Sequence, residues 1–128
     1  MTADVRQLHA LAGVFRSSAA AAQVQVQAVV ERGALNVKNG WRDNARATAG
    51  RHARLYPNSI SYDVRRWPGG ASAVIGPDKS RPQGALGNLL EFGSVKNPPH
   101  LDGLRALQAE APAFMAHIAA VASQWGRG

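Results

Sequence analysis

The sequence predicts a single α+β domain that combines long helices with a small antiparallel sheet. Apolar residues recur at spacings of three and four towards both ends of the chain, which is the period of an amphipathic helix. Between them, residues 59–75 alternate with a period of two on either side of a Pro-Gly turn, which predicts a β-hairpin. A length of 128 residues fits one domain, and alanine supplies much of the 45% hydrophobic share, so we expect a thin core.

Residues 1–33 are expected to form an N-terminal helix. Thr2 is a candidate N-cap, and Gly33 is the expected stop. Residues 24–27 also alternate with a period of two, which leaves a strand as the alternative there, although the neighbouring alanines favour a helix. The apolar stripe of this helix consists of Val5, Leu8, Ala12, Phe15, Ala19, Ala22, Val26 and Val29.

Residues 34–57 predict a second, basic helix. Asn39 is a candidate cap, Gly40 and Gly50 weaken the helical pattern, and Pro57 ends it. Its expected inner face consists of Trp41, Ala45, Ala49 and either His52 or Ala53.

The hairpin is expected over residues 58–77, with Ile60, Tyr62 and Val64 on one face of its first strand. Residues 78–100 form the connection that follows, and its polar first part predicts a loop. Residues 101–125 predict a C-terminal amphipathic helix. Pro112 should kink or split this helix near Glu110, because proline lacks the backbone donor. The stripe of this helix consists of Leu104, Leu107, Ala111, Phe114, Ile118, Val121 and Trp125.

The net charge of +7 is concentrated in one part of the chain. Residues 32–66 hold eight basic residues and two acids, and the remainder is nearly neutral. A localised basic block predicts contact with a polyanion or an acidic protein face, and the alternative is a solvated helix face. Aromatic residues interleave with this block, a pattern also seen in nucleic-acid-binding proteins. The residues assigned to a DNA or acidic-partner contact are Arg42, Arg46, Arg51 and Arg54.

The sequence shows no pattern of catalysis or metal binding. It contains no cysteine, which excludes disulfides, thiolate catalysis and cysteine-ligated zinc. The four histidines lack metal-ligand spacing, and the eight acids are dispersed rather than paired. We therefore expect a non-enzymatic protein without a cofactor or metal. The apolar runs are too short for a membrane span or a signal peptide.

Residues 84–100 are the most distinctive segment of the chain. They include Gly87-Asn88-Leu89-Leu90-Glu91-Phe92-Gly93-Ser94 and then Pro98-Pro99-His100, directly before the C-terminal helix. One acid and one aromatic stand between apolar residues and glycines, a combination that no common reaction requires. We interpret the segment as a fixed backbone element that presents a surface to a partner.

These residues, with Leu101, resemble the LEFG(T/S)…P-h-L motif of small connector proteins of long-tailed bacteriophages. That family includes head–tail neck, tail-completion, tail-terminator and minor tail proteins. The resemblance extends to residues 56–60 before the hairpin and 74–78 after it, and it covers residues 54–121. The chain departs from the motif after Leu101, where the usual phenylalanine and second proline are missing.

The resemblance implies a structural virion protein that joins portal-side and tail-side rings at the phage neck and lets DNA pass. It implies a homo-oligomeric ring, six-fold in common cases with twelve-fold as the alternative, assembled in the host cytoplasm. Its partners would be neighbouring connector, tail-terminator or tail-tube proteins, with non-specific DNA contact in the channel. The residues assigned to subunit or partner contact are Leu90, Glu91, Phe92, Gly93, Pro98, Pro99 and His100.

Glu91 would then be a capping acid or a structural ion-pair acid that meets an arginine of the next subunit, and the alternative is an ordinary exposed glutamate. The alternative function for the chain is a basic DNA-binding accessory protein that uses the block at residues 32–66.

Overall fold

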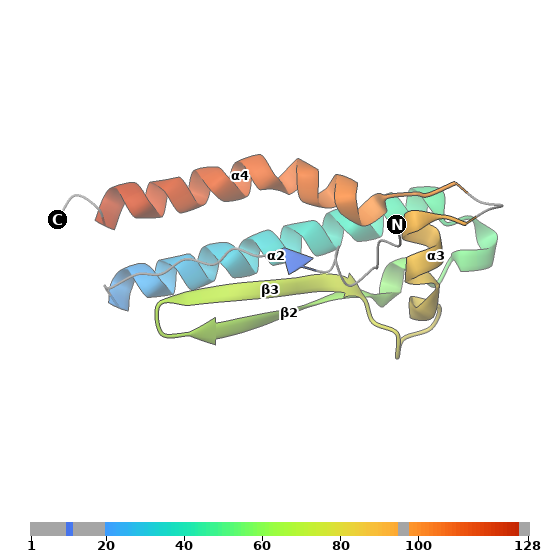
Figure 1. Ribbon diagram of the computed structural model, residues 1–128, viewed down its shortest axis with the longest axis horizontal. Helices are drawn as coiled ribbons and strands as arrows, with labels where there is room; N and C mark the ends of the chain where they lie inside the picture. The colour runs from blue at the N-terminus through green and yellow to red at the C-terminus, as the bar shows by residue number, and fades with distance from the viewer. Residues whose placement is uncertain (1–9, 12–19, 95–97, 126–128) are drawn as a thin grey trace.

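The computed structural model describes residues 10–11, 20–94 and 98–125, with the side chains of residues 23–94 and 98–124. It confirms the α+β class. A long helix, α2 (Ala20–Thr48), runs through the middle of the molecule. A second long helix, α4 (Asp102–Trp125), lies along one side of α2, and a β-hairpin lies along the other (Figure 1). A short helix, α3 (Gly87–Phe92), lies at the end where α2 finishes and α4 begins.

Helix α2 is continuous across residues that the sequence divides between two helices. The predictions that Gly33 ends the first helix and that Asn39 caps the second are therefore wrong. A Cβ atom on Gly33 would lie 2.8 Å from Cδ2 of Phe114 in α4, and one on Gly40 would lie 3.3 Å from the Cβ of Ala106. The close approach of α4 outweighs the roughly 1 kcal/mol that a glycine costs inside a helix.

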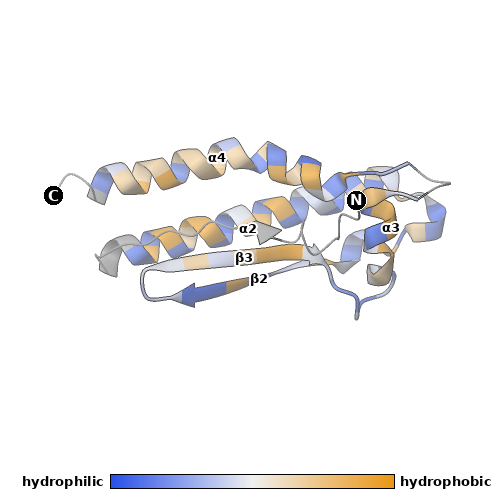
Figure 2. Cartoon of the chain, viewed as in Figure 1, coloured by the Kyte–Doolittle hydropathy of each residue, from blue (hydrophilic) through white to orange (hydrophobic). Residues whose placement is uncertain are grey.

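The buried face of α2 keeps a spacing of three and four throughout its length. Along α2 and α4 hydrophobic and hydrophilic residues alternate, as amphipathic helices require (Figure 2). Residues 24–27 are helical, which excludes the strand alternative. The buried row is Val26, Val30, Ala34, Val37, Trp41 and Ala45.

The predicted basic helix ends earlier than expected, at Thr48. Gly50 follows with a φ of 67°, a value that a right-handed helix does not allow, and two short 3-10 helices continue the chain at Arg51–Ala53 and Pro57–Ser59. Ala53 is buried and His52 is exposed, so Ala53 is the residue that completes the inner face.

Most of the first half of the predicted N-terminal helix lies outside the described residues. Ala10–Leu11 form a short strand, β1, so the helix prediction is wrong at these two positions. They pair with Val74 and Ala73 of the hairpin, and these strand–strand hydrogen bonds replace helical ones. The stripe residues Val5, Leu8, Ala12, Phe15 and Ala19, together with the side chain of Ala22, fall outside the described part.

The hairpin is confirmed and lies within the predicted range of residues 58–77. Its strands are β2 (Ile60–Trp67) and β3 (Gly70–Pro77), paired antiparallel. Trp67 stands opposite Gly70, so Pro68 and Gly69 alone form the turn. Gly69 has a φ of 91°, which suits the second central position of a type II turn.

The three-stranded sheet has the order β1-β3-β2, which places β2 at an edge. The predicted inner face of β2 is confirmed, because Ile60 is fully buried and Tyr62 and Val64 pack against the core. In Figure 1, α2 covers the sheet on the side that faces α4.

Helix α4 continues through Pro112, so the prediction of a split near Glu110 is wrong. Pro112 leaves the carbonyl of Gln108 without its helical donor, and both residues are exposed, so water can replace that hydrogen bond. The predicted stripe is confirmed over the described side chains: Phe114 and Ile118 are buried, and Leu104, Leu107, Ala111 and Val121 are partly buried. The side chain of Trp125 lies outside the described part.

Candidate functional site

The first part of the distinctive segment, residues 84–92, is folded against the end of the hairpin. A short 3-10 helix (Gly84–Leu86) leads into α3. A Cβ atom on Gly84 would lie 1.9 Å from the carbonyl oxygen of Asp78, and one on Gly87 would lie 2.4 Å from Cγ of Pro77. These two glycines therefore let the segment sit directly on the chain that leaves β3.

Glu91, the acid of the motif, is 1% exposed and caps the N-terminus of α4. Its carboxylate accepts hydrogen bonds from the backbone N–H of Gly103 at 3.0 and 3.1 Å and from that of Leu104 at 3.1 Å. These are N–H groups of the first helical turn, which have no acceptor within the helix. Glu91 thus does for α4 what a local N-cap side chain does for most helices.

The reason for this distant cap is the residue that stands at the start of α4. Leu101 immediately precedes the helix, and its side chain has no oxygen to offer. It has a φ of 54°, a left-handed conformation that is rare for leucine. Its backbone N–H donates to the carbonyl of Glu91 at 3.1 Å, and the N–H of His100 donates to the carbonyl of Leu90 at 2.9 Å. The end of α3 therefore holds the chain in the conformation that starts α4.

A second buried acid, Asp102, ties α4 to the end of α2. Its side chain is 1% exposed. The carboxylate accepts a hydrogen bond from the Thr48 hydroxyl at 2.7 Å and pairs with Arg105 at 2.6 Å. Its backbone carbonyl accepts a hydrogen bond from the Asn44 amide at 3.0 Å. We call Glu91, Asp102 and these partners the Glu91–Asp102 joint.

Aromatic residues lie beside the joint. A Cβ atom on Gly103 would lie 2.7 Å from the ring of Trp41, so the first turn of α4 rests on the indole. Burial raises the pKa of Tyr56 above its ordinary value, and the charges of Glu91 and Asp102 raise it further. The phenol is therefore neutral, as a buried hydroxyl beside two acids should be.

The joint is arranged to hold structure rather than to react. Each carboxylate oxygen that we describe faces a donor of the chain itself: Glu91 faces backbone N–H groups, and Asp102 faces Thr48 and Arg105. Neither acid is open to a substrate at 1% exposure. Among the described residues, no group of three or more histidine and acidic side chains is placed to hold a metal ion.

The structure corrects the interpretation of Glu91. The capping role is confirmed, the reading as an ordinary exposed glutamate is wrong, and no arginine of another subunit is needed to satisfy the carboxylate. The partner of Glu91 could not be predicted from local sequence, because Glu91 and Gly103 are 12 positions apart and the carboxylate binds backbone N–H groups, which every residue but proline carries.

The other predicted contact residues gather at the same end of the molecule. Leu90, Phe92, Gly93 and His100 are half-buried, and Pro98 and Pro99 are exposed. A cavity of about 370 Å³ opens beside them between the end of α2 and α3, and exposed Leu89 is on its wall. The residues that line it are Thr48, Ala49, His52, Ala53, Leu86, Leu89, Leu90, Pro98 and His100.

The four predicted basic contact residues do not form one free patch. The Arg42 guanidinium donates to the carbonyl of Ile60 at 2.7 and 3.0 Å and so holds the start of β2. Arg46 pairs with Asp43 at 3.0 Å on the surface. Arg51 and Arg54 are exposed just beyond α2. Lys38, which was not among them, lies on the ring of Tyr62, 5.4 Å from its centroid.

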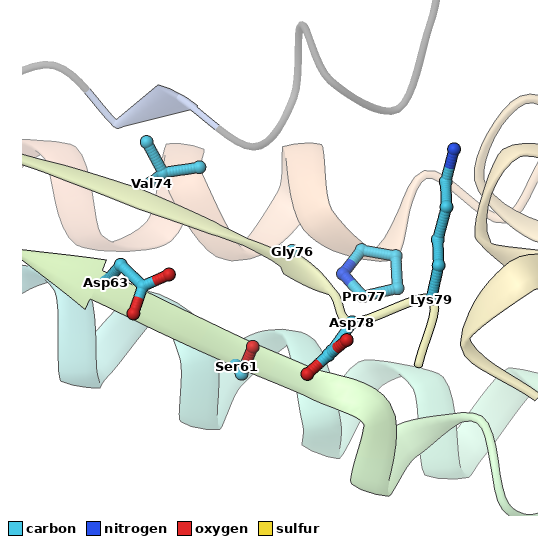
Figure 3. Close-up of a pocket in the computed structure, with 7 residues that line it drawn as sticks. All are labelled: Ser61, Asp63, Val74, Gly76, Pro77, Asp78 and Lys79. Atoms are coloured by element: carbon cyan, nitrogen blue, oxygen red, sulfur yellow. The ribbon is translucent and has the colours of Figure 1, made fainter. Parts of the chain in front are cut away.

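A second cavity, of about 420 Å³, lies on the sheet and is shown in Figure 3. Its acids are Asp63 on β2 and Asp78 after β3. Asp78 is already engaged by the N–H and hydroxyl of Ser80, which lower its pKa, and by Arg81 at 3.5 Å. The full lining is Ser61, Asp63, Val74, Gly76, Pro77, Asp78 and Lys79. Since Asp78 is satisfied locally, we assign no chemistry to this cavity.

Comparison with known protein families, with curated proteins and with solved structures finds no match for this chain. Within the described residues, neither long helix has a stretch apolar enough to cross a bilayer.

Glu91 should make stability depend on pH. Its pKa is raised by burial, which outweighs the hydrogen bonds from Gly103 and Leu104, and the charge of Asp102 adds to the rise. The folded state therefore binds more protons than the unfolded state. The stabilisation is complete below the unfolded pKa of about 4.3 and is lost as pH rises through the folded value.

We therefore expect the free energy of unfolding of the wild type, relative to Glu91→Gln, to fall as the pH rises above about 4.3. Chemical denaturation at a series of pH values measures this difference, in which groups common to both proteins cancel. A difference that stays constant with pH, or grows as the pH rises, would contradict the expectation.

Proposed function

We propose that this chain is a structural subunit of the head-to-tail connector of a long-tailed bacteriophage, a neck or tail-completion ring protein that joins portal-side and tail-side rings and lets DNA pass. One observation carries the proposal: the acid of the LEFGS motif, Glu91, is committed to holding α4 in place. A motif whose acid and glycines are used for internal geometry suits a protein that builds an assembly rather than one that turns over a substrate.

The end of the molecule around this motif offers a contact surface for neighbouring subunits. The joint fixes the backbone of α3 and the start of α4, so the surface is preorganised. Leu89, on the wall of the cavity, is 42% exposed, and Leu55, two residues after the lining residue Ala53, is 47% exposed. In a ring, these groups would be buried against the next subunit or a partner ring.

The test is assembly of the purified chain, alone and with the products of the neighbouring genes. We expect native mass spectrometry and electron microscopy to show a closed ring, or binding to a partner ring. Leu89→Asp should reduce assembly at least about tenfold, because it places a charge in an apolar contact. The matched control is Val24→Asp, at a 65% exposed position near the far end of α2. A chain that stays monomeric and binds no partner refutes the proposal.

A DNA-binding accessory role is the second candidate, and the exposed positions of Arg51 and Arg54 favour it. The test replaces Arg46, Arg51 and Arg54 with alanine and leaves Arg42 in place, since Arg42 holds Ile60. We expect the DNA affinity to fall and its salt dependence to weaken. The control replaces Lys79 and Arg81, two exposed cations outside the block at residues 32–66. Absent or salt-insensitive DNA binding by the wild type removes this candidate.

A further inference from the structure

We propose that the free edge of β2 binds an extended acidic peptide segment of another protein, which adds a strand to the sheet. The inference rests on the backbone of β2 and on the cations beside it. It does not depend on the connector role proposed above.

The register of the hairpin decides which backbone groups of β2 are free. Trp67 and Gly70 close a two-residue turn, so they exchange hydrogen bonds, and the bonded pairs then alternate along the strands. The N–H of Asp78 donates to the carbonyl of Ser59, which continues the same alternation beyond the strands. The N–H and C=O groups of the intervening residues Ile60, Tyr62, Val64 and Arg66 consequently point away from β3.

In the part of the chain that the structure describes, hydrogen-bond partners are found only for the outward backbone groups of Ile60, the first of these four residues. The carbonyl of Ile60 accepts the hydrogen bonds of Arg42, and its N–H donates to the carbonyl of Pro57. Among the described residues, nothing bonds to the outward backbone groups of Tyr62, Val64 and Arg66. A row of alternating donors and acceptors on an edge strand is a template for a further strand.

The side chains that flank this row are mainly cationic. Lys38 and Arg42 project from α2 beside β2, and neither has an acidic partner among the described residues. The pKa of each is lowered, first by burial and then by neighbouring cations that include Arg81. At the other end, Arg66 pairs with Glu31 and Arg65 is exposed, and the end of β2 near the turn is hydrophilic in Figure 2.

The positive charge beside β2 indicates which kind of molecule can bind at this edge. A second copy of the chain would bring the same cations to the same edge, and like charges repel. Nucleic acid would satisfy Lys38, but its phosphates are acceptors and cannot donate to the outward carbonyls. A peptide strand supplies both donors and acceptors, and acidic side chains supply the charge.

The occupant should carry acids at alternate positions. Side chains of an added strand point to the two faces of the sheet in turn, so every second one lies on the face that packs on α2. These side chains come near Lys38 and Arg42. The preferred segment therefore alternates acidic with β-branched residues over the length of Tyr62–Arg66.

The direct test uses a labelled eight-residue peptide that alternates glutamate with valine. Fluorescence anisotropy should show binding, and amide exchange should show protection of Tyr62, Val64 and Arg66. Two peptides serve as controls: one with lysine in place of glutamate, and one N-methylated at alternate residues, which removes the donors. Binding of the glutamate peptide that is equal to that of either control overturns the proposal.

Two protein variants, each with a matched control variant, separate backbone pairing from charge. Val64→Pro removes an outward N–H without touching a bond to β3, and should weaken binding at least about tenfold, while Val64→Thr should not. Lys38→Gln should weaken binding about threefold to fivefold. Arg65→Gln, which removes a cation from the opposite face of β2, should change binding less than about twofold. Equal losses for Lys38→Gln and Arg65→Gln would mean that only net charge is sensed, and would overturn the proposal.

Two further outcomes identify other occupants. Competition by duplex DNA with no effect of Val64→Pro would mark the edge as a polyanion site, and a dimer abolished by Val64→Pro would mark it as a contact between copies. Either result overturns the proposal. If Val64→Pro fails to fold, the comparison between the glutamate peptide and its N-methylated form tests backbone pairing by itself. The peptide experiment uses no connector partner, so it can fail while ring assembly succeeds, and the reverse.

Discussion

Replacing Glu91 with alanine is expected to destabilise the fold by about 3 kcal/mol, since it leaves the buried N–H groups of Gly103 and Leu104 without an acceptor and opens a cavity. The loss should be measurable as a lower midpoint in urea denaturation with an unchanged slope. A smaller loss is expected for Glu91→Gln, because the amide oxygen still accepts one of the hydrogen bonds.

Asp63→Ala is the matched control for this experiment. Asp63 is exposed on β2 and belongs to the same class of side chain, so its loss should change stability by less than about 0.5 kcal/mol. If Glu91→Ala were as mild as Asp63→Ala, the capping role would be wrong, whatever the geometry of the carboxylate.

The second large effect is expected at Gly84. A Cβ atom there would stand 1.9 Å from the carbonyl oxygen and 2.7 Å from the carbonyl carbon of Asp78, and neither backbone atom can rotate away. Gly84→Ala must therefore move the chain between β3 and α3, at an expected cost of at least about 3 kcal/mol. Thermal and urea unfolding would both report it.

Gly50→Ala distinguishes this clash from the general effect of removing a glycine. At Gly50 no atom lies within 4 Å of the added Cβ, and only the backbone conformation, with φ 67° and ψ −175°, opposes the change, so the cost should be about 1 to 3 kcal/mol. A Gly84→Ala protein as stable as Gly50→Ala would show that the segment can leave β3 without loss.

Local patterns predicted the parts of the fold that depend on neighbours in sequence. The alternation of Ile60, Tyr62 and Val64 and the Pro-Gly turn were sufficient for the hairpin, and the stripe from Leu104 to Val121 was sufficient for α4. The helix prediction was wrong at Gly33 because many helices end at a glycine. Gly33 lies inside α2 because the ring of Phe114 packs against it. Phe114 is far away along the chain, so the pattern of residues around Gly33 could not predict this contact.

Capping was one of the roles expected for Glu91, but the helix that it caps was not predicted. Residues 84–100 were singled out by their unusual composition, and the described residues among them, 84–94 and 98–100, lie at one end of the molecule. The role of Glu91 depends on Leu101, which occupies a cap position without an oxygen and takes a left-handed φ. No propensity favours leucine there, so only the assembled structure could reveal that the cap comes from α3.

The partners of Glu91 are main-chain atoms, and this has a consequence for how such a chain can change over time. An N–H group is present at position 104 with any residue except proline, so substitutions there leave that hydrogen bond of the cap intact, whereas the ring of Trp41 restricts position 103 to glycine. Glu91 and the closely packed glycines Gly84, Gly87 and Gly103 are the residues that cannot be exchanged. Proteins that share this arrangement can keep these few motif residues while most other positions of their sequences are substituted.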